Sequence, residues 1–329
     1  MEYTLLGHSG IRVSKLCVGC MSFGEAGSMH DWTLDLGATS AMVKRALDLG
    51  INFFDTANCY SKGTSEEYLG EALRRSGVKR QDVVIASKVY FNPGRLSRDA
   101  IRREVEGSLK RLGTDYLDLY IIHRFDYGTS ILETMEVLNE LVREGKVRSL
   151  GASAMYGYQF QDMQLVARDN GWMPFTAMEN HYNLLYREDE REMIPICREM
   201  SVALMPYSPL AAGRLARLEW ADGTKRGETD VKAKEKYDST REIDYPIVRR
   251  VAEVAGRHGV SMARVALAWL WAKGVASPIV GATSIPQLED ACGALDVKLT
   301  PDEIAYLEEL YRPHAVVGAL RENPPEEKA

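Results

Sequence analysis

Three apolar runs in the first half of the chain end on an ionisable residue, in the order Asp55, Lys88 and His123. A fourth ionisable side chain, Tyr60, stands five residues past Asp55. A carboxylate, an ammonium, an imidazole and a phenol differ in charge and in proton affinity, so together they can hold, transfer and orient protons. If the fold brings these residues to one place, they form an acid–base centre.

Each of the four also has an ordinary structural explanation when it is taken alone. Asp55 could cap a helix, Lys88 could extend along the surface to water, and His123 could be a hydrogen-bonded core histidine. Tyr60 could be an aromatic side chain of a loop. Their joint position at successive run ends favours the functional interpretation, because burying a lysine beside a carboxylate costs on the order of several kcal/mol per ion.

The chain alternates short apolar runs with longer segments of helical period. Several runs are almost continuously apolar, which is typical of parallel strands that are buried on both faces. Strand–helix units recur every 26–36 residues through the seventh strand. The eight predicted strands cover residues 15–19, 51–55, 83–88, 117–123, 147–151, 175–180, 201–206 and 277–281.

The segments between the strands carry helix signals at both ends. One predicted helix starts at Ser97 and stops at Gly113, and the next starts at Ser130 and stops at Gly145. Glycine is favoured just past a helix end, where the backbone turns left-handed. The predicted apolar faces comprise Ile101, Val105 and Leu109 in the first helix, and Leu132, Met135, Leu138 and Val142 in the second.

Repeated strand–helix–strand units with right-handed crossovers form either a closed α/β barrel or a doubly wound open sheet. Eight strands favour the (β/α)8 barrel, and a barrel of about 250 residues with insertions fits a single domain. We therefore expect one domain over residues 1–329. In such a barrel the active site is built at the carboxyl ends of the strands, which puts the four ionisable residues on one rim.

Four segments lie outside the repeat. Residues 3–14 are predicted to form a hairpin that plugs the bottom of the barrel, and residues 211–243 a long mobile loop. The capping-box sequence TPDE, with proline at the first helical position, predicts an extra helix over about residues 300–310. The tail over residues 312–329 is expected to be partly disordered.

The net charge of −6, from 41 basic and 47 acidic residues, gives no basic field that would attract nucleic acid or an anionic membrane. The first residues are polar and no run of about 18 apolar residues occurs, so we expect neither a signal peptide nor a membrane span. The five cysteines are an odd number and dispersed, which is typical of reduced thiols. We expect a cytoplasmic protein.

Several common cofactor and nucleophile motifs are missing. No G-x-G-x-x-G segment follows a strand, so the dinucleotide fold of most dehydrogenases is not supported. The P-loop, H-E-x-x-H and G-x-S-x-G patterns are absent as well. Cys17 and Cys20 form a C-x-x-C pair, but a zinc site would need a second pair, so we interpret them as packing residues. No metal site is expected.

Three long segments resemble a known family. The sequence FFDTANCYSKGTSEEYLGEAL resembles the aldo-keto reductase signature around its catalytic aspartate and tyrosine. VVIASKVY and LKRLGTDYLDLYIIH resemble the segments that carry its lysine and histidine. The resemblance covers about residues 1–311, with the motifs in the same order. Within the family, ENHYNLLYREDERE and MPYSPLAAGRL are most similar to a bacterial branch near the potassium-channel β subunits.

The resemblance implies an enzyme that reduces aldehydes or ketones to alcohols with a nicotinamide cofactor. Tyr60 would donate the proton, although a free phenol with a pKa of about 10 is a weak acid at neutral pH. A Lys88 ammonium beside the phenol would lower that pKa, and Asp55 would hold Lys88 charged and in position. His123 would orient the carbonyl oxygen through a hydrogen bond.

The same resemblance implies NADPH as the cofactor. Ser153 would contact the nicotinamide amide, while the next position, often Asn in the family, is Ala154 here. Glu179 stands where the family usually has Gln, and a carboxylate cannot donate to the amide oxygen. Tyr207 would stack on the nicotinamide ring. The implied cofactor contacts are Gly19, Cys20, Met21, Asp55, Ser153, Glu179, Tyr207, Ser208, Pro209, Leu210, Ala211, Gly213, Gly281, Thr283, Gln287 and Asp290.

The segment GATSIPQL, residues 281–288, resembles the part of the family that holds the adenosine 2′-phosphate. From its residues alone it is a strand that turns into a helix, whose N-terminus favours anions. It contains no acidic residue to favour a free ribose, which supports NADPH over NADH. Cations of the 211–243 loop could close over the cofactor or remain solvated; they are Lys225, Arg226, Lys232 and Lys234.

Beyond a small carbonyl compound, the sequence does not determine the substrate. Arg124 could bind a carboxylate or phosphate of the substrate, or it could pair with Asp126. The alternative function is a cofactor-sensing regulatory or binding module with little turnover, and a homo-oligomer is left open. Candidate walls of the substrate pocket, all in predicted loops after strands, are Trp32, Tyr90, Phe91, Arg124, Phe125, Tyr156 and His181.

Overall fold

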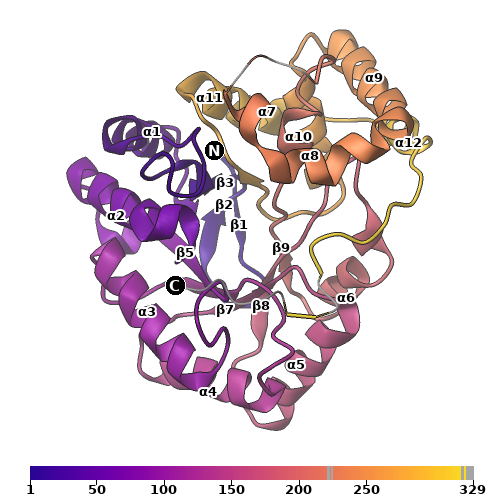
Figure 1. Ribbon diagram of the computed structural model, residues 1–329. Helices are drawn as coiled ribbons and strands as arrows, with labels where there is room; N and C mark the ends of the chain where they lie inside the picture. The colour runs from indigo at the N-terminus through magenta and orange to yellow at the C-terminus, as the bar shows by residue number, and fades with distance from the viewer. Residues whose placement is uncertain (221–222, 224, 320–321, 324–329) are drawn as a thin grey trace.

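The computed structural model describes residues 1–220, 223, 225–319 and 322–323, without the side chain of Lys225. Its centre is an eight-stranded parallel sheet in the order β10-β3-β4-β5-β6-β7-β8-β9. Helices surround this sheet on its outside (Figure 1). The strands are β3 (Cys17–Gly19), β4 (Phe53–Asp55), β5 (Val84–Val89), β6 (Leu119–Ile122), β7 (Leu150–Ser153), β8 (Phe175–Glu179), β9 (Ala203–Leu204) and β10 (Ile279–Val280).

Backbone hydrogen bonds also join the first and last strands of this order. The carbonyl oxygen of Leu204 accepts from the amide of Ala276 at 2.9 Å, and that of Pro206 accepts from Ile279 at 3.0 Å. The sheet therefore curls into the α/β barrel that the eight predicted runs favoured, and an open doubly wound sheet is excluded.

Each predicted strand is present within a few residues of its expected bounds. Every residue of β5 is buried, as are those of β6, β7 and β8. Helices cover the outer face of the sheet and the other strands of the barrel cover the inner face. Continuous apolar runs are the sequence signature of strands buried in this way.

The helices that alternate with the strands begin and end close to their predicted caps. Ser97 and Gly113 flank α3, and Gly113 adopts a left-handed φ of 65°. Ser130 caps α4 by accepting from the amide of Glu133. Leu132 was assigned to the buried face of α4, but its side chain is exposed. The buried face of α4 instead includes Thr134, Met135 and Leu138. The helices of the ring are α1 (Leu36–Asp48), α2 (Thr64–Ser76), α3 (Arg98–Leu112), α4 (Ile131–Arg143), α5 (Gly157–Asp169), α6 (Met193–Glu199), α9 (Arg241–His258), α10 (Met262–Ala272) and α11 (Ile285–Gly293).

The segment over residues 211–243 was predicted as a long loop, and this is wrong for much of its described part. It contains two short helices, α7 (Lys225–Thr229) and α8 (Val231–Tyr237). Asp230 caps α8 by accepting from the amide of Ala233. The segment is rich in Lys and Glu, which are good helix formers, but it lacks the apolar periodicity by which helices were recognised.

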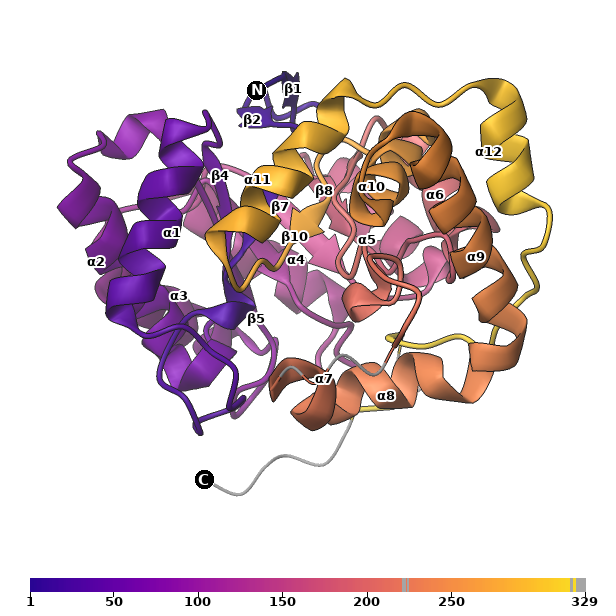
Figure 2. The same ribbon diagram turned by 90° about the horizontal axis from the view of Figure 1, so that it is seen from above.

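The N-terminal residues form an antiparallel pair, β1 (Tyr3–Leu5) and β2 (Arg12–Ser14). Leu6 and Val13 pack into the apolar cluster inside the barrel together with strand residues such as Phe53. Figure 2 shows this hairpin at one end of the barrel and α7 and α8 at the opposite end. The hairpin therefore covers one opening, and the other is left for the site.

The last helix, α12 (Pro301–Glu308), begins in a capping box between Thr300 and Glu303. The chain then runs without regular structure over residues 311–319. The predicted disorder at the end of the tail concerns residues 320–321 and 324–329, which lie outside the described residues. Within the described part of the chain, none of the helices is both long and apolar enough to cross a membrane.

Candidate active site

The Lys88 ammonium lies at the centre of the predicted acid–base group. Its Nζ donates to Oδ2 of Asp55 at 2.5 Å and lies 3.2 Å from the hydroxyl of Tyr60. It also donates to the carbonyl oxygen of Thr56 at 2.9 Å. The three side chains are buried, so these contacts form away from bulk water.

Neighbouring strands position these groups. Asp55 is the last residue of β4, and Lys88 is the last but one of β5. Beyond β4, the amide of Thr56 donates to Ala86 and that of Asn58 to Lys88, both on β5. These bonds continue the ladder past the end of β4 and hold the following loop, which carries Tyr60, against β5.

The backbone directly after Tyr60 is strained. Ser61 and Lys62 have φ angles of 47° and 55°, in the left-handed region that non-glycine residues rarely adopt. The hydroxyl of Ser61 donates to the carbonyl oxygen of Phe23 at 3.0 Å and helps to hold the turn. Such strain persists where the surrounding structure over-determines it, and it clusters at functional sites.

His123 completes the predicted set from the next strand. It directly follows β6, and its amide donates to the carbonyl of Val89 at 2.9 Å. Its ring meets Tyr60 edge-on at 5.8 Å and Phe91 edge-on at 5.0 Å between centroids. Its Nδ1 is buried without a hydrogen-bond partner. The structure thus brings the four predicted residues to one rim of the barrel.

Burial and charge set the protonation of this group. Burial alone disfavours an ammonium, but the carboxyl groups of Asp55 and Glu179 raise the pKa of Lys88 well above its usual value. Burial lowers the pKa of His123 well below its usual value, and the charges of Lys88 and Arg124 lower it further. At neutral pH the site therefore holds an ammonium and a neutral imidazole.

Lys88 lowers the pKa of Tyr60 as predicted, but a larger effect opposes it. Burial raises the pKa of Tyr60, and it outweighs the lowering by the Lys88 charge. Glu179 and Asp55 add negative charge that also raises this pKa. Lys88 acts in the expected sense, but alone it does not overcome the cost of a buried phenolate.

The predicted nicotinamide contacts Ser153 and Glu179 lie opposite each other on β7 and β8. Ser153 Oγ and Glu179 Oε2 are both buried, and neither atom forms a hydrogen bond. Unpaired buried polar atoms are costly, so these two are available for a bound polar group. Ala154 has a φ of 41°, a conformation that Asn adopts more readily than Ala.

The segment after β9 carries the predicted ring-stacking and pyrophosphate residues. Tyr207 is stacked on His181 at 5.1 Å between ring centroids, and its hydroxyl is buried without a partner. Ser208, Ala211 and Ala212 have φ angles of 53°, 48° and 53°. Three left-handed non-glycine residues within five positions are a second strained stretch on the same rim, as expected of a ligand-binding loop.

The other predicted contacts at the start of the barrel follow β3. Gly19 pairs with Asp55 in the sheet, and Cys20 and Met21 form a 3-10 turn directly after it. A side chain at Gly19 would meet the Ile279 side chain at 2.8 Å, so glycine is needed for strand packing. Burial raises the pKa of Cys17 and of Cys20 well above that of a free thiol, in line with packing residues.

The GATSIPQL segment lies beside α7. The Arg226 guanidinium donates to the carbonyl of Gly281 at 3.4 Å and lies 4.3 Å above the ring of Trp32. Gln287 Oε1 accepts from the amide of Thr283 at 2.9 Å, which holds the start of α11. Asp290, predicted to contact the cofactor, pairs with Arg264 at 2.7 Å. Its carboxylate is therefore engaged on α10.

The four cations of residues 211–243 that were predicted near the cofactor differ in their surroundings. Arg226 donates to Gly281 and also pairs with Asp230 at 3.4 Å. Lys232 pairs with Glu235 at 2.9 Å, and Lys234 donates to the Glu228 carbonyl. The side chain of Lys225 lies outside the described residues. Of the four predicted cations, Arg226 is the one that the structure places beside the predicted phosphate segment.

Two residues that the sequence did not single out belong to the same region. Lys236 of α8 lies with its Nζ 4.7 Å from the ring centroid of Tyr207. Asn180, directly after β8, is buried with neither amide atom hydrogen-bonded. Nothing in their local sequence distinguishes them: Asn180 follows a strand as many loop residues do, and Lys236 is one of several lysines in the segment.

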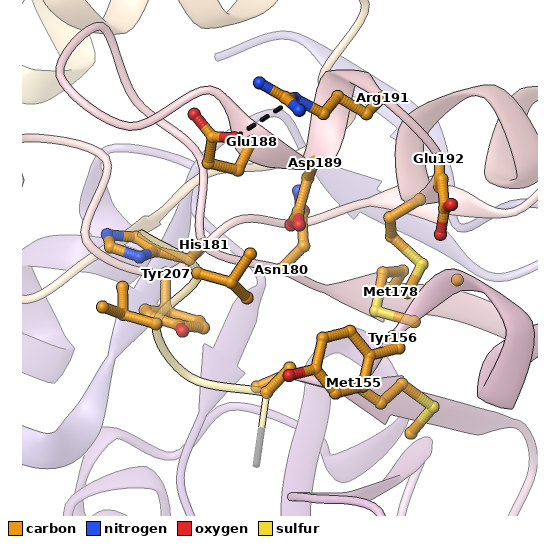
Figure 3. Close-up of a pocket in the computed structure, with 16 residues that line it drawn as sticks. Met155, Tyr156, Met178, Asn180, His181, Glu188, Asp189, Arg191, Glu192 and Tyr207 are labelled. Carbon is orange, nitrogen blue, oxygen red and sulfur yellow. Dashed lines mark ion pairs between the residues drawn. The ribbon is translucent and has the colours of Figure 1, made fainter. Parts of the chain in front are cut away.

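A cavity of about 260 Å³ lies next to Tyr207 (Figure 3). Asn180, His181, Met155 and Tyr156 line it, and Val317 of the C-terminal tail closes it. None of Asp55, Tyr60, Lys88 or His123 lines this cavity. It extends the predicted nicotinamide region away from the acid–base group.

Four of the seven predicted pocket walls fall into two groups. Phe91 and Arg124 adjoin His123, with the Arg124 guanidinium 5.7 Å from the ring centroid of Phe91. Tyr156 and His181 line the cavity beside Tyr207. Trp32 lies under Arg226, Tyr90 meets Phe91 edge-on, and Phe125 meets Tyr127 edge-on.

Arg124 does not form the predicted alternative pair with Asp126. Its guanidinium donates to the carbonyl oxygen of His123 at 2.8 Å. Asp126 accepts instead from the amides of Leu96 and Gly128 and from Asn323 of the tail. Among the described residues, no carboxylate forms an ion pair with Arg124, and a substrate anion stays the predicted partner.

Comparison with known proteins gives a consistent result. A model of the aldo/keto reductase family matches residues 15–312. A protein of Schizosaccharomyces pombe, provisionally named an aryl-alcohol dehydrogenase, is 42% identical over 97% of this chain and 98% of its own. The versiconal hemiacetal acetate reductase of Aspergillus parasiticus is 41% identical over 96% of this chain and 98% of its own. An aldo-keto reductase of Fusarium vanettenii is 40% identical over 97% and 93%.

The family model covers the strands that carry the acid–base group and the predicted cofactor contacts. The relatives match this chain along almost its full length, and their names describe oxidoreductases. The chain therefore belongs to the aldo/keto reductase family, and it is an oxidoreductase that uses a nicotinamide cofactor.

Proposed function

We propose that this protein reduces an aldehyde or ketone to an alcohol with NADPH, and that Tyr60 supplies the proton. The observation that carries the proposal is the contact of Lys88 with both Asp55 and Tyr60 in a buried site. A phenol whose ammonium neighbour is already in place can release its proton with little reorganisation. His123 is neutral, so it orients the carbonyl oxygen and leaves the proton transfer to Tyr60.

The residues present fit a nicotinamide cofactor. Ser153, Glu179 and Tyr207 each have a buried polar atom without a hydrogen-bond partner, and all three follow or end neighbouring strands. The carboxamide of a nicotinamide has an NH₂ group that donates and an oxygen that accepts, so it can form hydrogen bonds with such atoms. When bound, the cofactor supplies the hydride; the residues of this chain bind it, exclude water and provide the proton.

The NADPH preference rests on Arg226 beside Gly281, because a guanidinium is suited to bind a phosphate through two donors. A cytoplasmic location and a place in a bacterial branch near the potassium-channel β subunits remain predictions. The relatives described above are fungal. The intact acid–base group supports an enzyme with turnover rather than a cofactor-sensing module.

The test is the oxidation of NADPH, followed by its absorbance, with a panel of aldehydes and ketones. We expect carbonyl-dependent decay that Tyr60→Phe reduces about 10²–10⁴-fold, since general acid catalysis contributes about that factor. Cofactor binding, measured by fluorescence, should persist in the variant. If Tyr60→Phe keeps the rate of the unmodified protein, the proton donor is a different group. If the unmodified protein binds NADPH but turns over no carbonyl compound, the sensing module is the better description.

A further inference from the structure

Lys88 faces a second carboxyl group in addition to that of Asp55. Oε2 of Glu179, at the end of β8, lies 3.4 Å from Lys88 Nζ, compared with 2.5 Å for Oδ2 of Asp55. Both carboxyl groups and the ammonium are buried. The contact with Glu179 has ion-pair distance but not hydrogen-bond geometry, since Oε2 has no hydrogen-bond partner.

One ammonium cannot neutralise two carboxylates away from water. When two carboxyl groups share such a site, one of them retains a proton to a much higher pH. Asp55 makes the shorter, hydrogen-bonded contact, so the proton stays on Glu179. Burial and the charge of Asp55 raise the pKa of Glu179 to about 8, although Lys88 opposes the shift.

A third charged side chain, that of Arg124, also acts on Glu179. Arg124 favours its ionised form, but by less than Lys88 does. In return, an ionised Glu179 would raise the pKa of Tyr60 and of Tyr207, both already raised by burial. The protonation of Glu179 therefore acts on the proton donor and on the predicted ring-stacking residue.

We propose that Glu179 is a positioning residue whose proton is linked to the redox state of the cofactor: it holds the proton with NADPH and releases it with NADP⁺. This rests on the proposed function, in which Glu179 and its strand neighbour Ser153 face the nicotinamide. A protonated carboxyl group donates as well as accepts, so it can serve both atoms of a carboxamide, as a glutamine does.

The electrostatic reason is the charge of the nicotinamide ring. The ring is neutral in NADPH and carries a positive charge in NADP⁺. A cation beside a buried carboxyl group favours its ionised form, so binding of NADP⁺ drives the proton from Glu179 to solvent. Binding of NADPH adds no such charge and leaves the proton in place. By linkage, NADP⁺ gains affinity relative to NADPH as the pH rises toward 8.

Calorimetric titration at pH 7 in two buffers of different ionisation enthalpy measures the protons released on binding. We expect the unmodified protein to release more protons with NADP⁺ than with NADPH, by up to one. The 2′-phosphate is common to both nucleotides, so its own proton cancels in the difference. The ratio of the two dissociation constants should change by up to about tenfold per pH unit below pH 8.

Glu179→Gln should abolish both the difference in proton release and the pH dependence of the ratio. Glu67→Gln, an exposed glutamate of α2, is the matched control and should keep both. Equal proton release with the two nucleotides in the unmodified protein would overturn the proposal, and this measurement does not require a folded variant. If both nucleotides bind with a constant ratio, the Glu179 proposal fails and the reductase proposal stands. If neither nucleotide binds, the reductase proposal itself fails.

Discussion

The Lys88 ammonium and the Asp55 carboxylate form a buried ion pair at 2.5 Å, with almost no exposed surface on either side chain. Removing one partner of such a pair leaves an uncompensated charge in the interior. We expect Lys88→Met to lower the free energy of unfolding by about 3–5 kcal/mol, as measured by urea denaturation at pH 8. The variant should also lose most of its carbonyl reduction.

Two comparisons separate this effect from a general loss of charge. Lys44→Met removes an exposed lysine that pairs with Asp48 on α1, and we expect a change within about 1 kcal/mol. Lys88→Met combined with Asp55→Asn should recover part of the stability, because the stranded carboxylate is gone. A Lys88→Met protein as stable as the Lys44→Met protein would show that the pair contributes nothing to folding.

The sequence was sufficient to predict the barrel and the convergence of the four ionisable residues. Both follow from short-range signals: continuous apolar runs and polar residues at their ends. It was not sufficient to predict the second carboxyl partner of Lys88. Glu179 is 91 positions away along the chain, and the contact exists because the curled sheet brings the end of β8 close to the end of β5.

The sequence was also not sufficient to predict the pKa of Tyr60. The residue types predicted the lowering by Lys88, but the larger effect is burial, which depends on how completely the loop covers the phenol. The helices α7 and α8 were missed because they show no apolar periodicity. Their place over the rim, with Lys236 near Tyr207, is a property of the folded chain alone.

Arg226 should determine the preference between the two nucleotides. We expect Arg226→Gln to weaken NADPH binding about tenfold or more, since a hydrogen bond to a charged group contributes about 1.5–3 kcal/mol. Binding of NADH, which lacks the 2′-phosphate, should change by less than about twofold. Fluorescence titration with both nucleotides measures this. Lys232→Gln is the control, because Lys232 pairs with Glu235 away from the GATSIPQL segment. If Arg226→Gln weakened the binding of NADPH and NADH equally, Arg226 would contact a part of the nucleotide other than the 2′-phosphate.

Arg124 should favour substrates that carry an anionic group. Its guanidinium adjoins His123 and forms no ion pair with a described carboxylate. We expect Arg124→Gln to raise KM about tenfold for 4-carboxybenzaldehyde and to leave KM for benzaldehyde within about twofold, from the same hydrogen-bond energies. Steady-state kinetics with the two aldehydes is the measurement. The same rise for both aldehydes would mean that Arg124 shapes the pocket without binding charge.

The C-terminal tail should loosen as the pH rises. His314 Nε2 lies 2.9 Å from Oδ1 of Asp244, which is buried in α9, and this contact raises the pKa of His314. The protonated histidine is therefore favoured in the folded protein. The ion pair stabilises the docked tail fully when the pH is below the pKa of histidine in the unfolded chain, about 6.5. This stabilisation is lost as the pH rises through the higher pKa of His314 in the folded protein.

Hydrogen exchange at the Val317 amide reports on this docking, because that amide donates to the hydroxyl of Tyr186 at 3.0 Å. After correction for the intrinsic exchange rate, we expect its protection to fall between pH 6 and pH 8. His314→Gln should show low protection at both pH values, since glutamine cannot carry the charge that Asp244 stabilises. His8→Gln changes a histidine of the N-terminal hairpin, far from His314 in the sequence, and should behave as the unmodified protein does. Equal protection at the two pH values in the unmodified protein would show that contacts other than the one between His314 and Asp244 hold the tail.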